Sequence, residues 1–403
     1  MNRKLLHRWL ALLAGAILLA CSSVVRAEDI DIYALPPGAG DLPNILFLID
    51  NSANWGADVT NRGSCSTWPD TGASLPSYDS SKKSGAQLCA LVTVVERLAA
   101  RAAANGGQPV ARIGVMLFNS GSSKIGAYPR IAFSAVTPSN KNDLQRQIKA
   151  ITGTGGTDTS AAAPQVGLGM YEAYLWFKGE APLYGRDTPT FDPTAFLSGP
   201  TRYNSPAAAS CGRNFIILVS NGDPGTQTQV VDAELSFLRQ VTTNTTAIPA
   251  PAGVNNSTRN LFQSWGDEYA RELLNKDFSN RDGTQSITTF AVGVIGANSD
   301  PRNSTTPPFD GFFSYLDNVA RYGGSPRYQN GAGQPSYFYP ALGPGAIADA
   351  IDRIFDRVLS ANTVFTSAAL PISVSTQGTY KNQVFIGMFR PDELMRPRWY
   401  GNL

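Results

Sequence analysis

The sequence predicts a doubly wound (Rossmann-like) α/β fold, in which a mostly parallel sheet lies between layers of helices. Three observations lead to this prediction: four continuous apolar runs are typical of strands buried on both faces, segments with helical spacing alternate with them, and oxygen-bearing residues follow several of the runs. Alternating strands and helices form parallel sheets, which bind ligands at the carboxyl ends of their strands.

The elements are expected in alternating order along the chain. The strands are predicted at residues 44–50, 111–119, 214–220 and 286–296. The helices are predicted at 89–104, 142–151, 160–177, 230–241, 261–278 and 346–359. The first helix ends at Asn105, which is followed by two glycines, a usual helix stop. An aromatic segment, 326–342, is expected to be an edge strand and loop of the same domain, with an adhesive patch as the alternative.

The composition changes near residue 362. Residues 362–403 contain short runs in which Tyr380, Val384 and Ile386 alternate with polar neighbours, and no further helix pattern occurs. We therefore expect an α/β domain over 41–361, preceded by a linker at 28–40 and followed by a β-rich tail at 362–403.

The first 27 residues have the pattern of a cleaved secretory signal. Basic residues precede a short apolar run, and small residues precede Glu28. A lipoprotein signal with Cys21 as the lipidated residue is the alternative, and both would export the chain. Cleavage after Ala27 removes four basic and no acidic residues, so 33 basic residues become 29 against 31 acidic ones. We expect no nucleic-acid partner and no membrane span in the mature chain.

The same cleavage removes His7, the single histidine. The mature chain then has no Ser-His-Asp or Cys-His constellation and no histidine zinc site, so we expect a protein that is not an enzyme. In an oxidising compartment Cys65 and Cys89 are the favoured disulfide pair. Cys211 is then left over, or pairs with one of the two instead.

Oxygen-bearing side chains follow three parts of the predicted sheet. They are Asp50, Ser52 and Asn54 after the first strand, Thr157 and Asp158 in a glycine-rich loop, and Asn221 and Asp223 after the third strand. Each group alone is ordinary turn chemistry. Together they form a set of hard oxygen ligands suited to Mg²⁺, with Mn²⁺ or Ca²⁺ as alternatives.

This arrangement resembles a von Willebrand factor A domain with its metal-ion-dependent adhesion site, over about residues 41 to 361. The family's first aspartate and serine fall on Asp50 and Ser52, and its loop threonine falls on Thr157. Two positions depart from the family pattern: Asn54 replaces a serine, and Asn221 replaces an aspartate. The resemblance implies a divalent cation with one open coordination position, which an acidic group of a partner completes.

The asparagine at position 221 removes one negative charge from the family's ligand set. Asp158 and Asp223 are the two nearby candidates to supply that charge, although neither aligns with the family's aspartate. We therefore expect weaker metal binding than the full motif gives.

Residues 384–403 resemble the segment after the A domain in PilY-type (PilC-type) proteins of the type IV pilus tip, where the chain continues into a β-propeller. This resemblance implies an exported adhesion and pilus assembly module at the cell surface, pilus tip or outer membrane. Its implied partners are minor pilins, host or abiotic surfaces, and the module's own C-terminal domain. Insertions at 56–84, 178–212 and 241–259 are expected to set partner choice.

Two other functions stay open at this point. One is a lipid-anchored A-domain protein unrelated to pili, which depends on Cys21. The other is an exported hydrolase that uses the same carboxylates with a metal ion. We identify no nucleophile beside a base in the mature chain, which disfavours this second alternative.

Overall fold

The computed structural model describes residues 42–59, 81–119, 125–153, 156–160, 164–199, 201–207, 212–222, 224, 228–242, 264–279, 284–295, 311–325, 337–341, 343–360, 365–369, 385–390 and 400–402. The predicted signal at 1–27, the linker at 28–40, Cys65, Cys211 and Asp223 lie outside these residues. So do most of the insertions expected at 56–84 and 241–259. The domain boundaries stay predictions.

A six-stranded sheet forms the centre of the fold, with strand order β3-β2-β1-β4-β5-β6. Its strands are β1 (Asn44–Ile49), β2 (Arg112–Phe118), β3 (Ala127–Ala135), β4 (Asn214–Ser220), β5 (Ile287–Val294) and β6 (Phe338–Ala341). All neighbouring pairs are parallel except β2 and β3. The predicted doubly wound α/β fold is confirmed.

The central strands are buried along their whole length and mostly apolar, because helices cover both of their faces. Every residue of β1 and β4 is buried. These two strands pair in register from Asn44 opposite Asn214 to Ile49 opposite Val219. Two parallel strands in register end at the same edge of the sheet, so the residues that follow Ile49 and Ser220 are brought together there.

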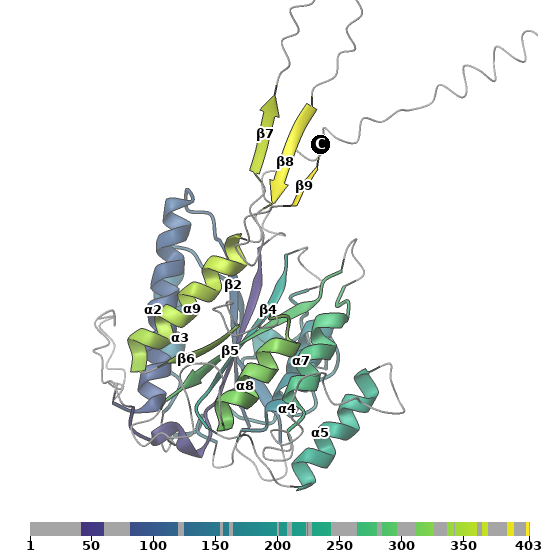
Figure 1. Cartoon of the computed structure of the whole chain (residues 1–403). Helices are drawn as coiled ribbons and strands as arrows, with labels where there is room; N and C mark the ends of the chain where they lie inside the picture. The colour runs from purple at the N-terminus through teal and green to yellow at the C-terminus, as the bar shows by residue number, and fades with distance from the viewer. Residues whose placement is uncertain are drawn as a thin grey trace, which may run out of the picture. The chain divides into compact units, whose positions relative to one another are not determined.

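Helices lie on both faces of the sheet (Figure 1). One layer contains α2 (Lys83–Ala104), α3 (Lys141–Lys149) and α9 (Gly343–Ser360), in which α2 packs against both others. The other contains α4 (Val166–Lys178), α7 (Gly266–Asn275) and α8 (Gly311–Tyr322), with α5 (Thr228–Val241) packed on α4 and α7. Short 3₁₀ turns, η3 (Ala53–Gly56) and η4 (Pro193–Ala195), lie in the connecting loops.

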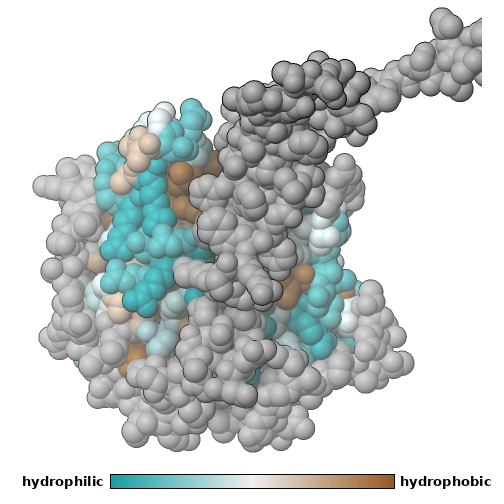
Figure 2. Space-filling view, turned by 45° about the horizontal axis from the view of Figure 1, so that its top comes forward, coloured by the Kyte–Doolittle hydropathy of each residue, from teal (hydrophilic) through white to brown (hydrophobic). Residues whose placement is uncertain are grey.

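A row of ion pairs joins the exposed sides of α2 and α9. Arg97 contacts Asp349 and Asp352, and Arg101 contacts Asp352 and Asp356. The hydrophilic band in Figure 2 lies on the side of the molecule where Figure 1 shows these two helices. Exposed ion pairs stabilise a fold by less than about 1 kcal/mol each, so the buried apolar stripes of the helices contribute more to their packing.

The structure contains two elements that the sequence patterns did not predict. Strand β3 is an antiparallel edge strand that contains Pro129, and α8 is a helix rich in aromatic residues. Helix α2 also begins at Lys83, six residues before the predicted start at Cys89. Strand β6 lies at the other edge of the sheet, as expected for the aromatic segment, whose residues 326–336 lie outside the description.

The tail forms a separate three-stranded antiparallel sheet of β7 (Phe365–Ala369), β8 (Phe385–Arg390) and β9 (Tyr400–Asn402). Cys89 is disulfide-bonded. Its partner lies outside the described residues, so the pairing with Cys65 stays a prediction. Among the described helices, none has the length and apolar content that crossing a bilayer requires.

Candidate metal centre

Asp50 is a completely buried aspartate directly after β1. Three donors hold its carboxylate in place: Ser52 N donates to Oδ1 at 3.0 Å, while Asn221 N and Ser220 Oγ donate to Oδ2 at 2.9 and 3.0 Å. The side-chain amide of Asn221 also donates to the backbone oxygen of Asp50. The ends of β1 and β4 therefore close around one carboxylate.

Burial raises the pKa of Asp50 above its usual value, and the hydrogen bonds from Asn221, Ser52 and Ser220 partly offset this effect. A carboxylate offers about four acceptor positions. Three well-formed hydrogen bonds are made here, and the Ser52 hydroxyl also lies beside the carboxylate. A buried carboxylate with remaining acceptor capacity is stabilised by a cation, since a cation both neutralises its charge and fills the last position.

Two further buried side-chain oxygens at this centre lack a well-formed hydrogen bond to the described residues. Ser52 Oγ lies beside the Asp50 carboxylate, and Asn221 Oδ1 belongs to the side-chain amide whose nitrogen donates to Asp50 O. Both atoms are buried and make no well-formed hydrogen bond with any described residue. Buried polar atoms are normally satisfied, and exceptions need an explanation. Hydroxyl and amide oxygens beside a carboxylate fit a hard divalent cation such as Mg²⁺, which takes oxygen ligands.

Asn54 reaches the same edge from η3. Asn54 is exposed, and its side chain lies against the turn after β4. A Cβ added to Gly222 in this turn would lie 2.7 Å from Asn54 Nδ2. The structure thus gathers Asp50, Ser52 and Asn54, which follow β1, and Asn221, which follows β4, at the carboxyl edge of the sheet.

Asn51 is the residue at this edge that the sequence analysis did not single out. Its side-chain amide donates to Phe118 O at 2.9 Å and to Asp158 O, and its Oδ1 accepts from Phe118 N at 2.9 Å. Ser160 N donates to its backbone oxygen at 2.7 Å. Asn51 therefore ties the end of β1 to the end of β2 and to the loop at residues 156–160. The available signal was a polar residue between Asp50 and Ser52, directly after a buried strand.

Asp158 is a structural residue of this loop. Its buried carboxylate accepts from Tyr128 OH at 2.9 Å, from Arg130 Nε at 3.1 Å and from Thr152 N at 2.9 Å. Burial alone would raise the pKa of Asp158, but Thr152 N and Arg130 outweigh it and hold this pKa below the usual value. An aspartate paired in this way is unsuited to supply the charge that is missing at Asn221.

Thr157 lies at the exposed surface of the same loop. Its hydroxyl is 3.3 Å from Thr152 Oγ1. The loop is joined to the Asp50 centre through Asn51 and Asp158, the residue that follows Thr157. The role of Thr157 as a metal ligand stays a prediction.

The part of the 178–212 insertion that is described folds over the edge of β3. Asp192 N donates to Pro129 O at 2.8 Å, and Ala132 N donates to Asp192 Oδ2 at 2.8 Å. Such contacts protect an exposed strand edge from pairing with other chains.

The same insertion is anchored by Glu172, a buried residue of α4. Its carboxylate accepts from Leu183 N, Tyr184 N and Tyr203 OH. Burial raises the pKa of Glu172 to about 7 despite these bonds. The described part of the insertion is therefore held at both the strand edge and the helix.

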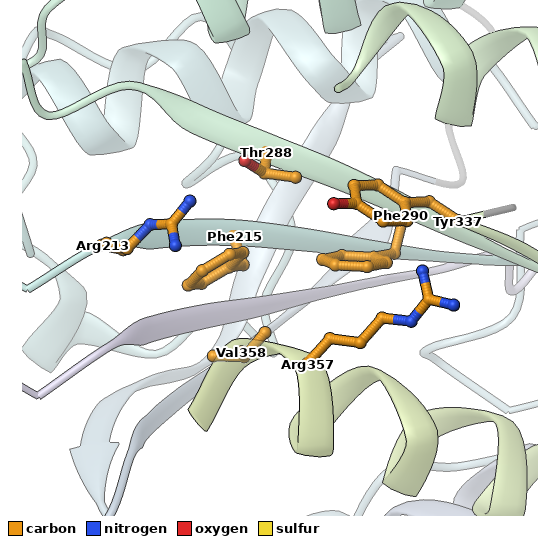
Figure 3. Close-up of a pocket in the computed structure, with 7 residues that line it drawn as sticks. All are labelled: Arg213, Phe215, Thr288, Phe290, Tyr337, Arg357 and Val358. Carbon is orange, nitrogen blue, oxygen red and sulfur yellow. The ribbon is translucent and has the colours of Figure 1, made fainter. Parts of the chain in front are cut away.

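A shallow pocket lies at the opposite end of the strands (Figure 3). Phe215 and Phe290 are among the residues that line it, and the guanidinium of Arg213 lies 5.6 Å from the ring centre of Phe215. At the other end Arg357 lies 5.4 Å from the ring centre of Tyr337. Phe215 is at the beginning of β4, whereas the Asp50 centre lies beyond the ends of β4 and its parallel neighbour β1. The pocket is therefore separate from the Asp50 centre.

The candidate metal ligands at the Asp50 centre are oxygen atoms of different chemical types. Within these residues, no group of three or more Asp, Glu, His or Cys side chains could hold a metal ion. A cation at Asp50 would therefore be bound through one carboxylate, a hydroxyl and an amide oxygen. Fewer charged ligands give weaker binding of a divalent cation.

Comparisons with known proteins find similar solved structures but no related sequence. No protein-family profile matches the chain. No curated protein matches it by sequence either. The solved structures that do match include the pilus adhesin SpaC, an A domain of a pilus tip protein and a mussel byssus protein.

SpaC from Lactobacillus rhamnosus GG has a TM-score of 0.38 and 9% identity, covering 85% of this chain and 36% of SpaC. The vWF domain of the type V pili tip protein Mfa5 from Porphyromonas gingivalis has a TM-score of 0.33 and 12% identity, covering 79% of this chain and 95% of that domain. Proximal thread matrix protein 1 from the mussel byssus, with a zinc-occupied MIDAS motif, has a TM-score of 0.33 and 12% identity, covering 79% of this chain and 45% of that protein.

This chain therefore spans less than half the length of two of these three proteins. Von Willebrand factor A domains recur among the structural neighbours. The central sheet with its antiparallel edge strand and two helical layers has the doubly wound, Rossmann-like α/β architecture that the sequence analysis predicted. The resemblance to a von Willebrand factor A domain stays a prediction.

Proposed function

We propose that this chain is a non-enzymatic adhesion module that binds an acidic group of its partner through a divalent cation at Asp50. One observation carries the proposal: a completely buried carboxylate lies beside two buried oxygens, Ser52 Oγ and Asn221 Oδ1, that lack well-formed hydrogen bonds to the described residues. A cation would complete all three. The ion supplies a positive charge that attracts a carboxylate, and the chain's own residues position the ion.

The edge around Asp50 is suited to binding because its backbone is fixed. Asn51 joins β1, β2 and the loop at 156–160, and Asn221 joins β1 to β4. A site on rigid strand ends loses little conformational entropy when a partner binds. Asn54 and Thr157 are exposed beside it, where they can contact a partner or the ion.

The proposed setting is the tip of a type IV pilus. It is supported by the resemblance of residues 384–403 to the segment that follows the A domain in PilY-type proteins. The proposed partners are minor pilins, host or abiotic surfaces, and a C-terminal domain that follows this module. The predicted signal at 1–27 would export the protein to the cell surface.

The experiment uses piliated cells that express the tagged chain, with Asp50→Ala and Asp58→Ala as variants. Asp58 is the matched control, because it is exposed and pairs on the surface with Lys82 at 2.8 Å. We expect the wild type and Asp58→Ala to co-purify with sheared pili and to promote surface attachment in Mg²⁺. Chelation and Asp50→Ala should both abolish attachment.

Two results would contradict parts of the proposal. Equal attachment of the Asp50→Ala cells, or attachment that chelation leaves unchanged, would exclude the cation-dependent mechanism. Equal amounts of the protein in sheared fractions from piliated and non-piliated cells would exclude the pilus setting. A lipid-anchored A-domain protein would then be favoured, and a mass spectrum of the mature N-terminus would test it.

A further inference from the structure

Lys83 is a buried lysine at the beginning of α2. Only 7% of the residue is exposed. It is the first residue of α2, where the helix dipole opposes a positive charge, and the first turn contains no acidic residue. Burial of an ammonium group is also costly unless hydrogen bonds compensate. The fold nevertheless places this charge at the edge of the sheet that carries Asp50.

A single residue separates the Lys83 ammonium from Asp50. Lys83 Nζ donates to the backbone oxygen of Asn221. The backbone nitrogen of the same Asn221 donates to Asp50 Oδ2 at 2.9 Å, and its side chain donates to Asp50 O. The positive charge is thus held within one residue of the candidate ligand set, by the residue whose Oδ1 is itself a candidate ligand.

We propose that Lys83 is a built-in positive charge that weakens divalent cation binding at the Asp50 centre. The inference rests on the proposed function, since it concerns the regulation of the same site. A fixed ammonium repels a divalent cation at short range, and salt screens buried charges poorly. Asp50 is the carboxylate at this centre among the described residues, so Lys83 offsets the charge that attracts the ion.

The consequence is a centre that loads only at high ion concentration. Such a site binds its partner in an environment rich in divalent cations and releases it when the ion is depleted. Lys83 is therefore a positioning and affinity-setting residue, which acts through Asn221 and does not contact the ion.

The test measures Mn²⁺ binding to the full chain by isothermal titration calorimetry. The variants are Lys83→Met, Lys83→Gln, Lys83→Arg, Lys82→Met and Asp50→Ala, with circular dichroism as the check on folding. Lys83→Gln removes the charge and keeps a donor for the Asn221 oxygen. Lys82→Met is the matched control, because the neighbouring Lys82 is 36% exposed at its side chain and pairs with Asp58.

We expect Lys83→Met and Lys83→Gln to bind Mn²⁺ about tenfold more tightly than the wild type. Lys83→Arg should bind no more tightly than the wild type, and Lys82→Met should stay within about twofold, because exposed charges are screened. Tighter binding separates a charge effect from structural damage, which would weaken binding. If Lys83→Met fails to fold, Lys83→Gln decides the matter.

Failure of this inference differs from failure of the proposed function. If Asp50→Ala abolishes binding but Lys83→Gln binds no more tightly than the wild type, the role of Lys83 is wrong and the metal centre stands. If Asp50→Ala binds Mn²⁺ as well as the wild type, the metal centre itself is wrong.

Discussion

Replacing Asn51 with alanine tests whether this side chain fastens the edge of the sheet. The side chain makes three buried hydrogen bonds, two through its amide nitrogen and one through Oδ1. Alanine leaves Phe118 N, Phe118 O and Asp158 O without these partners. A buried polar group without a partner costs about 1 to 3 kcal/mol, so the loss of three partners in Asn51→Ala should lower the free energy of unfolding by roughly 3 to 9 kcal/mol.

The assay is urea unfolding followed by circular dichroism and tryptophan fluorescence. Asn105→Ala is the matched control, since it removes the same atoms from an exposed asparagine at the end of α2, where the side chain makes one long hydrogen bond to Gln108 O at 3.4 Å. This control should change the free energy of unfolding by less than about 1 kcal/mol. If Asn51→Ala costs no more than the control, the three bonds do not fasten this edge and the reasoning is refuted.

Two further variants test other buried groups. Burial raises the pKa of Glu172 to about 7, so the folded state holds a proton that the unfolded state releases; stability from this group is greatest below the unfolded pKa and is lost as the pH rises to about 7. Glu172→Gln should therefore remove about 2 kcal/mol of the difference in unfolding free energy between pH 5 and pH 8. The control is Glu180→Gln, which removes a more exposed glutamate and should leave that difference nearly unchanged. Equal pH profiles of Glu172→Gln and the wild type would refute this prediction. Gly167→Ala should destabilise the fold by about 1 to 3 kcal/mol, because the added Cβ would lie 2.4 Å from Glu234 Cδ. The control is Gly345→Ala on α9, which has open space around it and should be nearly neutral in thermal unfolding. Similar melting temperatures for the two variants would contradict the packing argument.

The fold could be predicted because its determinants are local in sequence. The apolar runs of β1 and β4 are buried on both faces, and such strands appear as continuous hydrophobic segments. Strand β3 lacked this signal because it is an edge strand with a half-exposed pattern and contains Pro129. The strand order is a property of tertiary packing, and no local pattern specifies it.

The candidate site could be predicted in part for the same reason. Asp50, Ser52 and Asn221 closely follow buried strands, so their position at the carboxyl edge is implied by the fold class. Lys83 gave no such signal. It lies 138 residues from Asn221 in sequence, and only the packing of α2 against the sheet brings its ammonium to the Asn221 oxygen. Asp158 shows the reverse: its sequence position suggested a ligand, but Arg130 and Tyr128 occupy its carboxylate.

The most direct measurement of the central claim is a crystal structure of the chain grown with Mn²⁺, with the ion located by anomalous scattering. We expect one anomalous peak within bonding distance of Asp50, Ser52 Oγ and Asn221 Oδ1, and no such peak in crystals of Asp50→Ala. A well-ordered Asp50 edge without a peak at millimolar Mn²⁺, or a peak bound by other residues, would contradict the account.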